Sequence, residues 1–276
     1  GGPLGFLGNQ ILSTNPGSLP LIIAGLVFYL RRPEGRPYRA IGWAFVVLYL
    51  LLTLLNTKPY YFTPAFPMLL AGGACLLETV VARRRWRWVR PVYPALLGLS
   101  GILLVPLAMP VLSPSVFARS YSHLAGTSNS GAGQSTASPF PQYLADRFGW
   151  TALATTMAQA YHQLPPAEQA QACIFTSNYG EAGALNFYAK KYGLPPAISG
   201  HNTYYFWGPG SCSGAVMLTV GESRSDVEQS YSSVVQVATT SCQYCEDYED
   251  NVPIFLGTHP RFSSINADWK TTKHYD

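Results

Sequence analysis

Long apolar segments dominate the first 112 residues of the chain, and only two arginine-rich stretches interrupt them. A helix that crosses a bilayer needs about 20 largely apolar residues, because each residue adds only about 1.5 Å to its length. Four segments approach that length: 11–30, 40–56, 62–82 and 92–112. A buried soluble helix is the alternative for any one of them, but four in series favour an α-helical membrane bundle.

The arginine-rich stretches, residues 31–39 and 83–90, predict how the helices are oriented. Placing one arginine at the centre of a bilayer costs roughly 3 kcal/mol on insertion scales, so both stretches must lie in water. Because cytoplasmic loops are enriched in Lys and Arg, we place both in the cytoplasm. The connection 56–61 and everything after residue 112 then face the extracytoplasmic side. Nucleic-acid binding by these stretches is disfavoured by their bilayer-length apolar neighbours, so we expect no nucleic-acid partner.

The chain begins with Gly1-Gly2-Pro3-Leu4, without an initiator methionine and without the layout of a signal peptide. We therefore expect a truncated chain whose upstream part is missing. Residues needed for any chemistry can lie in that upstream part.

The sequence after residue 112 mixes polar and apolar residues, which indicates a water-soluble region. Residues 113–138 are rich in Ser, Gly, Thr and Ala and are expected to form a linker. Residues 139–276 are expected to form a small extracytoplasmic α/β domain with a partly parallel sheet. Residues 143–163 are predicted to form one helix or a helix pair, and residues 182–192 a further helix; the predicted strands are 172–176, 215–220, 233–238 and 252–256.

The turn from Ser177 to Glu181 lies between the first predicted strand and its helix, where α/β sheets often bind ligands. No G-x-G-x-x-G motif follows that strand, which disfavours nucleotide binding. Asn178, Tyr179 and Glu181 are therefore candidate ligand contacts. The alternative is that Ser177 or Asn178 only caps the helix.

Cys242 and Cys245 form a C-x-x-C pair near the end of the chain. A zinc site needs a second such pair, and a thioredoxin-like site needs the pair at a helix start, so neither pattern is complete. In an oxidising compartment we expect a disulfide, either within the pair or with Cys212. Free thiols, and metal or redox chemistry, are the alternatives; no metal site is assigned. Cys75 is expected to pack as a small apolar residue in a span.

Lys58, Tyr60 and Tyr61 lie at the predicted extracytoplasmic end of the third span, within the run Lys58-Pro59-Tyr60-Tyr61. An ammonium there can hold a phosphate, while the phenol rings contact a sugar or a lipid tail. The alternative is an aromatic belt with a lysine that extends to the interface.

The segment 198–209 places four consecutive aromatic residues, Tyr204 to Trp207, close to His201 and Asn202. Such a segment could stack on sugar rings or enter the membrane interface. The alternative is a packed loop that seals the domain against the helices.

The chain resembles a known family at these motifs. In the run from Lys58 to Pro67, and in the small-residue span that ends at Glu78, it resembles the C-terminal spans of bacterial members of glycosyltransferase family 39. These are relatives of the dolichyl-phosphate-mannose protein mannosyltransferases and of the lipid A aminoarabinose transferases. Three segments and the C-x-x-C pair are similar to the terminal domain of a bacterial subgroup: Asn178–Gly183, Ile198–Asn202 and Trp207–Pro209. The resemblance covers nearly the whole chain.

This resemblance implies a C-type glycosyltransferase with a polyprenyl-phosphate-linked sugar as donor, spanning the inner membrane of the bacterial cell envelope several times. Lys58 would contact the donor phosphate, and Tyr60 and Tyr61 would line the lipid–sugar groove. Candidate acceptor or sugar contacts are Asn178, Tyr179, Glu181, His201, Asn202 and Trp207. The expected partners are the bilayer, the donor, and an acceptor lipid, glycan or protein; no further cofactor is assigned.

The resemblance also implies a catalytic carboxylate in a first extracytoplasmic loop, and nothing in this chain matches it. Glu78 lies on the opposite side by the predicted orientation. We therefore expect the catalytic acid or base upstream, and this fragment to be inactive alone. The alternative is a non-enzymatic membrane protein whose soluble domain binds a glycan or protein through residues 204–207. A transporter would need ionisable groups within the spans, which have almost none.

Overall fold

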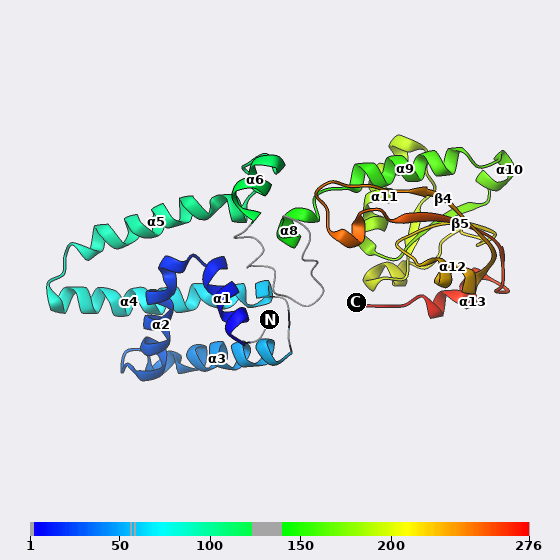
Figure 1. Cartoon of the computed structure of the whole chain (residues 1–276). Helices are drawn as coiled ribbons and strands as arrows, with labels where there is room; N and C mark the ends of the chain where they lie inside the picture. Colours follow the sequence, from blue (N-terminus) through cyan, green and yellow to red (C-terminus); the bar gives the residue numbers. More distant parts are fainter. Residues whose placement is uncertain (1–2, 56, 58, 123–139, 276) are drawn as a thin grey trace. The chain divides into compact units, whose positions relative to one another are not determined.

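The computed structural model of the chain describes residues 3–55, 57, 59–122 and 140–275. The chain divides into two compact units, Gly1–Gln142 and Tyr143–Asp276. The first is built of helices, and the second contains a sheet (Figure 1). Lys58 and residues 123–138 of the predicted linker lie outside the described residues.

The first unit is a succession of helices: α1 (Pro3–Ser13), η1 (Pro16–Ser18), α2 (Leu19–Arg31), η2 (Arg36–Tyr38), α3 (Arg39–Leu54), η3 (Pro59–Ala65), α4 (Phe66–Arg84), α5 (Val89–Ala108) and α6 (Pro114–Ser120). Among the described residues, three helical stretches are long and apolar enough to cross a membrane: Arg36–Leu54, Tyr60–Arg84 and Val89–Ala108. They correspond to the second, third and fourth segments expected from the sequence. Helix α6 lies within the segment that was expected to be linker.

The first expected span, residues 11–30, is wrong as a continuous helix. The chain breaks at Asn15, whose φ of 77° is left-handed, and Pro16 follows it. The Asn15 side chain instead caps η1 by accepting a hydrogen bond from the backbone N–H of Gly17 at 3.0 Å. The apolar stretch after the break, Pro16–Arg31, is shorter than the three candidate spans.

Helices α2 and α4 approach each other so closely that glycine is required at their contact. A Cβ at Gly25 would lie 2.1 Å from the carbonyl oxygen of Leu69, and a Cβ at Gly73 would lie 2.0 Å from that of Leu21. Small residues let apolar helices pack backbone to backbone. The small-residue part of α4 therefore serves helix packing.

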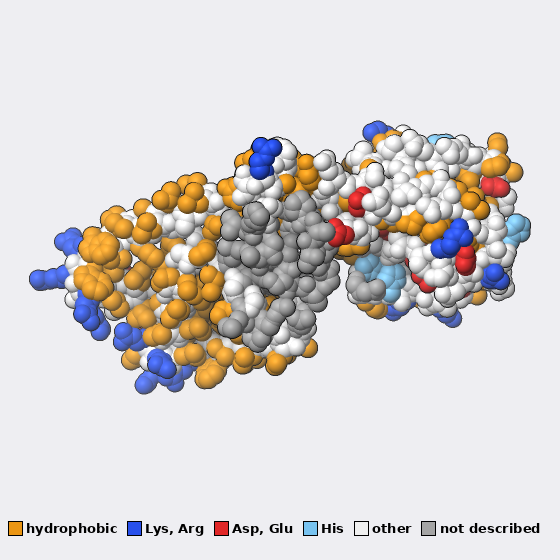
Figure 2. Space-filling model, in the orientation of Figure 1, with side chains coloured by type: hydrophobic (Ala, Val, Ile, Leu, Met, Phe, Trp, Pro, Cys, Tyr) orange, Lys and Arg blue, Asp and Glu red, His pale blue; other side chains and the backbone are white. Residues whose placement is uncertain are grey.

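Most of the described basic side chains of the first unit gather at one end, where α2 leads into α3 and α4 leads into α5 (Figure 2). Arg119 of α6 is an exception. Arg85 has a left-handed conformation, φ 58°, that ends α4 at this turn. Glu78 of α4 forms an exposed ion pair with Arg90 of α5. Glu78 therefore lies at the arginine-rich end of α4.

The second unit alternates helices and strands: α8 (Gln142–Ala145), α9 (Trp150–His162), α10 (Pro166–Gln169), β1 (Ala172–Thr176), α11 (Tyr179–Tyr192), β2 (Ala197–Ser199), η4 (Asn202–Trp207), β3 (Val216–Val220), α12 (Arg224–Ser230), β4 (Tyr231–Thr239), η5 (Asp247–Glu249), β5 (Pro253–Pro260), α13 (Ile265–Asp268) and η6 (Trp269–Thr271). Every strand and helix expected from the sequence in this region is present. The three-residue strand β2 was not expected.

The five strands form one mixed sheet in the order β2-β1-β3-β5-β4. Strand β1 is parallel to both β2 and β3, whereas β5 is antiparallel to β3 and to β4. The partly parallel sheet predicted from the sequence is confirmed. The chain runs from β1 to β2 on one side of β1 and then crosses to β3 on its other side.

Helices cover both faces of this sheet (Figure 1). On one face, α9 and α11 pack against Ile174 and Leu218. On the other face, α12 and residues 265–275, called the C-terminal segment below, pack against Cys173 and Met217. Neighbouring strand residues point to opposite faces, so β1 and β3 supply both hydrophobic cores. The described part of the chain thus combines a mainly helical first unit, which holds three helical stretches of membrane-spanning length, with an α/β unit.

Candidate functional site

Polar residues follow the parallel strands β1, β2 and β3, which end at the same edge of the sheet. Because β2 and β3 lie on opposite sides of β1, this edge is a topological switch point, where α/β sheets bind ligands. Six residues from four separate segments line one cavity of about 390 Å³ there: Ser177, Asn178, His201, Gly221, Glu222 and His274. We refer to it below as the strand-edge cavity.

Asn178 caps helix α11 at the strand-edge cavity. Its side-chain oxygen accepts a hydrogen bond from the backbone N–H of Gly180 at 2.6 Å, and the Glu181 carboxylate accepts one from the backbone N–H of Asn178 at 3.2 Å. This capping box satisfies N–H groups of the first turn. The helix N-terminus is therefore closed by its own residues rather than offered to an anion. Helix capping, the alternative interpretation of this turn, is confirmed, and Asn178 performs it.

Glu181 is buried, with 7% of its surface exposed. Burial raises the pKa of its carboxyl to about 7, and the charge of Glu222 adds to the rise; hydrogen bonds from the Asn178 backbone and the Ser177 side chain act against it. A carboxyl with this pKa gains and loses a proton near neutral pH.

Gly221 allows the end of β3 to approach the start of α11. Its φ of 81° is left-handed, and a Cβ there would lie 2.1 Å from Ser177 Oγ and 2.8 Å from a carboxylate oxygen of Glu181. Any other residue would face both backbone strain and a clash. Glycine at position 221 therefore lets the end of β3 lie directly against Ser177 and the buried Glu181 carboxyl.

His201 lies buried between α11 and the C-terminal segment. Its Nδ1 accepts a hydrogen bond from the backbone N–H of Tyr179 at 3.3 Å, and the side-chain amide of Asn202 lies 2.7 Å from its Nε2. The ring is therefore fixed by contacts on both nitrogens.

His274 connects the end of the chain to the strand edge. Its Nε2 lies 2.8 Å from the carbonyl oxygen of Ser177, and its Nδ1 lies 2.8 Å from that of Thr272. Its ring stacks on that of His201, with centroids 4.8 Å apart and planes inclined by 14°. The C-terminal segment thereby becomes one wall of the cavity.

A second group of carboxyls lies beside Glu181. Burial, followed by the charges of Asp146 and Asp247, raises the pKa of Glu246 to about 7. Burial, followed by the charges of Asp146 and Glu181, raises the pKa of Glu249 to about 8. These groups make the stability of the second unit dependent on pH near neutrality.

The structure brings most of the sequence-predicted contacts of this unit together. Asn178, Glu181, His201 and Asn202 lie at the strand edge, and the ring of Tyr179 packs on His201 with centroids 4.9 Å apart.

Trp207 lies apart from these residues, on η4. It is 70% exposed, and its ring packs against Tyr204 with centroids 4.4 Å apart. Both rings line a separate cavity of about 770 Å³ that also contains Asn186. The aromatic residues thus lie on a short helix, η4, that lines a cavity separate from the strand-edge cavity.

Ser177, Gly221, Glu222 and His274 were not identified from the sequence as ligand contacts. A signal existed for Gly221 and Glu222, because they directly follow a strand that the sequence predicts. His274 carries no such signal, since only the tertiary fold brings the chain end to this edge.

In the first unit, Tyr60 and Tyr61 lie on η3, directly before α4. They are 57% and 58% exposed, and their rings form an edge-to-face pair with centroids 4.7 Å apart. Phe62, in contrast, is buried. Lys58, the predicted phosphate contact, lies outside the described residues.

The expected disulfide of Cys242 or Cys245 is wrong, because both are free thiols. Cys212 pairs instead with Cys173 of β1, with Cα atoms 5.7 Å apart. The pairing of β1 with β3 brings Cys173 close to the loop that precedes β3, where Cys212 lies. Burial, together with the neighbouring Cys242 thiol, raises the pKa of the Cys245 thiol above its usual range. Cys75 is exposed on α4 rather than packed within the unit.

Within the part of the chain that the structure describes, no group of three or more His, Cys, Asp or Glu side chains is arranged to hold a metal ion. Comparison with protein-family models, with curated proteins and with solved structures finds no match. A function for this chain must therefore be argued from its own residues and geometry.

Proposed function

We propose that the chain is the C-terminal part of an integral membrane glycosyltransferase that transfers a sugar from a polyprenyl-phosphate donor to an extracytoplasmic acceptor. The proposal places the protein in the inner membrane of a bacterium, with the α/β unit on the extracytoplasmic side. Its motif-level support is the resemblance of the Lys58 to Pro67 run to the C-terminal spans of glycosyltransferase family 39.

One observation carries the proposal. The helical stretch Tyr60–Arg84 contains 25 residues, with Tyr60 and Tyr61 at its first end and Arg83 and Arg84 at its last. At about 1.5 Å per residue it is roughly 37 Å long, which exceeds the thickness of a bilayer hydrocarbon core. If the arginines lie in the cytoplasm, the tyrosine pair lies at the opposite interface.

The exposed phenol rings suit a lipid-linked sugar at that interface. Tyrosine combines an apolar ring with a polar hydroxyl, which fits the headgroup level of a bilayer. In this proposal Lys58 stabilises the leaving phosphate, and Tyr60 and Tyr61 line the groove that holds the donor. Glu78 lies at the other end of the same helix, paired with Arg90, so it is not assigned to catalysis. The catalytic carboxylate is expected upstream of this chain.

The α/β unit is proposed to act on the acceptor side. Its strand-edge cavity is lined by hydroxyl, amide, imidazole and carboxylate groups, which are the groups that recognise sugar hydroxyls. The Cys173–Cys212 disulfide supports an oxidising, extracytoplasmic location, because such bonds are rare in the cytosol.

Replacement of Lys58 by Ala in the full-length protein tests the proposal. Transfer from a polyprenyl-phosphate sugar should fall by about tenfold or more, since a stabilising charge at the leaving group is lost. The matched control is Lys190→Ala, in the last turn of α11, which should leave turnover within about twofold. Unchanged turnover in Lys58→Ala would show that Lys58 takes no part in sugar transfer.

A non-enzymatic, membrane-anchored binding protein is the second candidate. It is favoured by the strong exposure of Phe206 and Trp207 on η4, at 66% and 70%. Such rings stack well on sugars. If this candidate is right, Trp207→Ala abolishes glycan binding and no sugar transfer is found with the full-length protein.

A further inference from the structure

A further cavity lies on the sheet face opposite α9 and α11. It has a volume of about 290 Å³, enough for a molecule with a single ring. Strands β1 and β3 form its floor, and α12 and the C-terminal segment form its walls. We refer to it as the lower cavity, since α12 and α13 lie below the sheet in Figure 1.

Thr219 of β3 lines the lower cavity, and its hydroxyl oxygen is buried beneath the cavity surface. Only 4% of the surface of the residue is exposed, and Oγ1 has no hydrogen-bond partner among the residues that the structure describes. A buried hydroxyl without a partner costs about 1–3 kcal/mol. The described part of the fold therefore keeps a buried polar group to which it supplies no partner.

The aromatic side chains of the lower cavity have their polar groups already engaged. The Tyr231 hydroxyl donates to the carbonyl oxygen of Gly214 at 3.0 Å, and the Trp269 ring N–H donates to that of Tyr205 at 2.9 Å. These rings therefore offer apolar or π surface to a ligand. Phe175 and Phe262 add further ring surface to the lining.

The lining of the lower cavity carries an excess of negative charge. Three carboxylates line it: Glu222, Asp226 and Asp268. The basic residues of the lining are Lys273 and His274, and the Lys273 ammonium lies 5.2 Å from the ring centroids of both Tyr205 and Phe206. That cation is thus held by rings of η4. Carboxylates combined with aromatic rings are the groups that bind organic cations.

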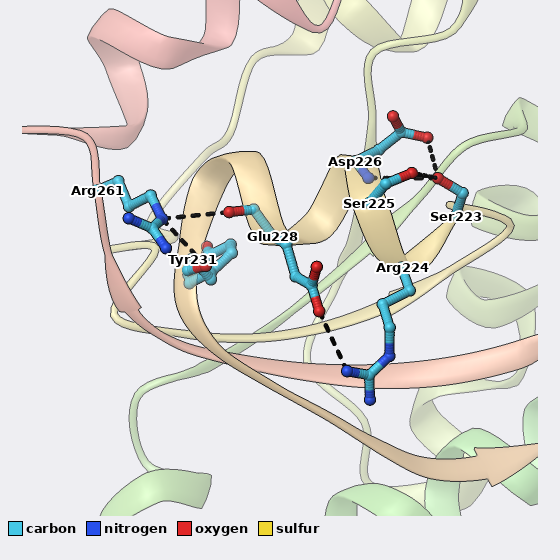
Figure 3. Close-up of polar contacts among 7 residues, drawn as sticks. All are labelled: Ser223, Arg224, Ser225, Asp226, Glu228, Tyr231 and Arg261. Carbon is cyan, nitrogen blue, oxygen red and sulfur yellow. Dashed lines mark hydrogen bonds and ion pairs between the residues drawn. The ribbon is translucent and has the colours of Figure 1, made fainter.

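The α12 wall is fixed at both ends (Figure 3). At its start, Ser223 Oγ accepts a hydrogen bond from the backbone N–H of Asp226 at 3.2 Å and donates one to the Asp226 carboxylate at 2.5 Å. At its end, Arg261 Nε donates to the carbonyl oxygens of Glu228 at 3.1 Å and Tyr231 at 3.3 Å. The cavity is therefore preformed, which lowers the entropic cost of binding.

We propose that the lower cavity binds a small organic cation, a primary amine attached to an apolar body of about one ring. Its ammonium is attracted by the carboxylates of the lining and donates a hydrogen bond to Thr219 Oγ1, which a rotation of that side chain turns toward the cavity. Its apolar body packs against Trp269 and the neighbouring rings. This site is independent of the proposed glycosyl transfer, so it stands if that function fails.

Calorimetric titration of the full chain in lipid nanodiscs tests the proposal, with empty nanodiscs titrated as the blank. The probes are 2-phenylethylammonium and its uncharged analogue 2-phenylethanol. The ammonium should bind at least about tenfold more tightly than the alcohol, because only the cation gains from the carboxylates. Equal affinity of the two probes, or no saturable binding of the ammonium, would overturn the proposal.

Two substitutions locate the site. Thr219→Val replaces the unsatisfied hydroxyl by a methyl of similar size, so the fold should be kept while affinity for the ammonium falls by about fivefold or more. Asp268→Asn should lower the affinity for 2-phenylethylammonium to a similar degree and leave the affinity for 2-phenylethanol unchanged. The matched control is Asp247→Asn, which removes one carboxylate from η5 and should change affinity by less than about twofold. Unchanged ammonium affinity in folded Thr219→Val would refute the assignment.

Discussion

The imidazole rings of His201 and His274 stack with centroids 4.8 Å apart and planes inclined by 14°. Each ring is also tied to the start of α11, His201 by the backbone N–H of Tyr179 and His274 by the carbonyl oxygen of Ser177. The pair therefore joins the C-terminal segment to the edge of the sheet where the parallel strands end. The strand-edge cavity and the lower cavity share Glu222 and His274 as lining residues.

Replacement of His274 by Ala should release the C-terminal segment. The change removes two contacts to backbone carbonyl oxygens and one ring stack, for a loss of about 1–3 kcal/mol in the free energy of unfolding. Hydrogen exchange should rise over residues 265–275. His259→Ala, an exposed histidine in β5, is the control, and equal exchange in the two variants would contradict the assigned role.

Replacement of Gly221 by Ala should destabilise the second unit by about 2 kcal/mol or more, because a positive φ and a clash act together. Gly208 offers a matched control: its φ is 73°, and a Cβ there would meet nothing within 4 Å. Gly208→Ala measures the backbone strain alone. Chemical denaturation of both variants gives the difference, and equal losses would show that the contact with Ser177 is unimportant.

The stability of the second unit should fall as the pH rises from about 5 to 8. The pKa of Glu181 is 4.5 in its ordinary state and about 7 in the fold. Between these two pH values the folded state holds a proton that the unfolded chain has released, so low pH favours folding. As the pH rises through this range, the free energy of unfolding falls by up to about 3 kcal/mol. Denaturation at several pH values measures the slope.

Glu181→Gln isolates this contribution, because glutamine keeps the capping acceptor but does not titrate. The free energy of unfolding of the variant should depend less steeply on pH than that of the wild type. The dependence that remains should arise from Glu246 and Glu249, whose pKa values are also raised. A wild-type stability that increases with pH across this range would be the opposite of the expected result.

Removal of the Cys173–Cys212 disulfide should lower the free energy of unfolding by about 4 kcal/mol, the loop-entropy value for a closed loop of this length. Cys212→Ser tests this by thermal unfolding. Cys242→Ser removes a free thiol and should leave the midpoint nearly unchanged. Alkylation of all five cysteines of the unreduced, denatured protein would show that the bond is absent.

The sequence predicts the larger elements of the second unit because their patterns are local. The apolar run from Ala172 to Thr176 and the capped helix after it are visible without tertiary information. Strand β2 has only three residues after Pro195 and Pro196, too few for a period to appear. Its existence depends on pairing with β1.

Tertiary contacts decide the features that the sequence did not predict. Cys173 looks like one apolar strand residue among others, and only the register of β1 with β3 places it beside Cys212. Thr219 looks like an ordinary strand residue until the fold buries its hydroxyl. In the first unit, Asn15 interrupts an apolar run by adopting a left-handed conformation, which composition alone does not reveal.

We propose that the arginine-rich turns and the α/β unit lie on opposite sides of a membrane. Fusion of alkaline phosphatase after Asp276 of the full-length protein, expressed in a bacterium, tests it most directly, because that enzyme folds only where its disulfides can form. The proposed orientation predicts high phosphatase activity from intact cells. An inactive phosphatase fusion, with a fluorescent cytoplasmic reporter at the same position, would contradict it.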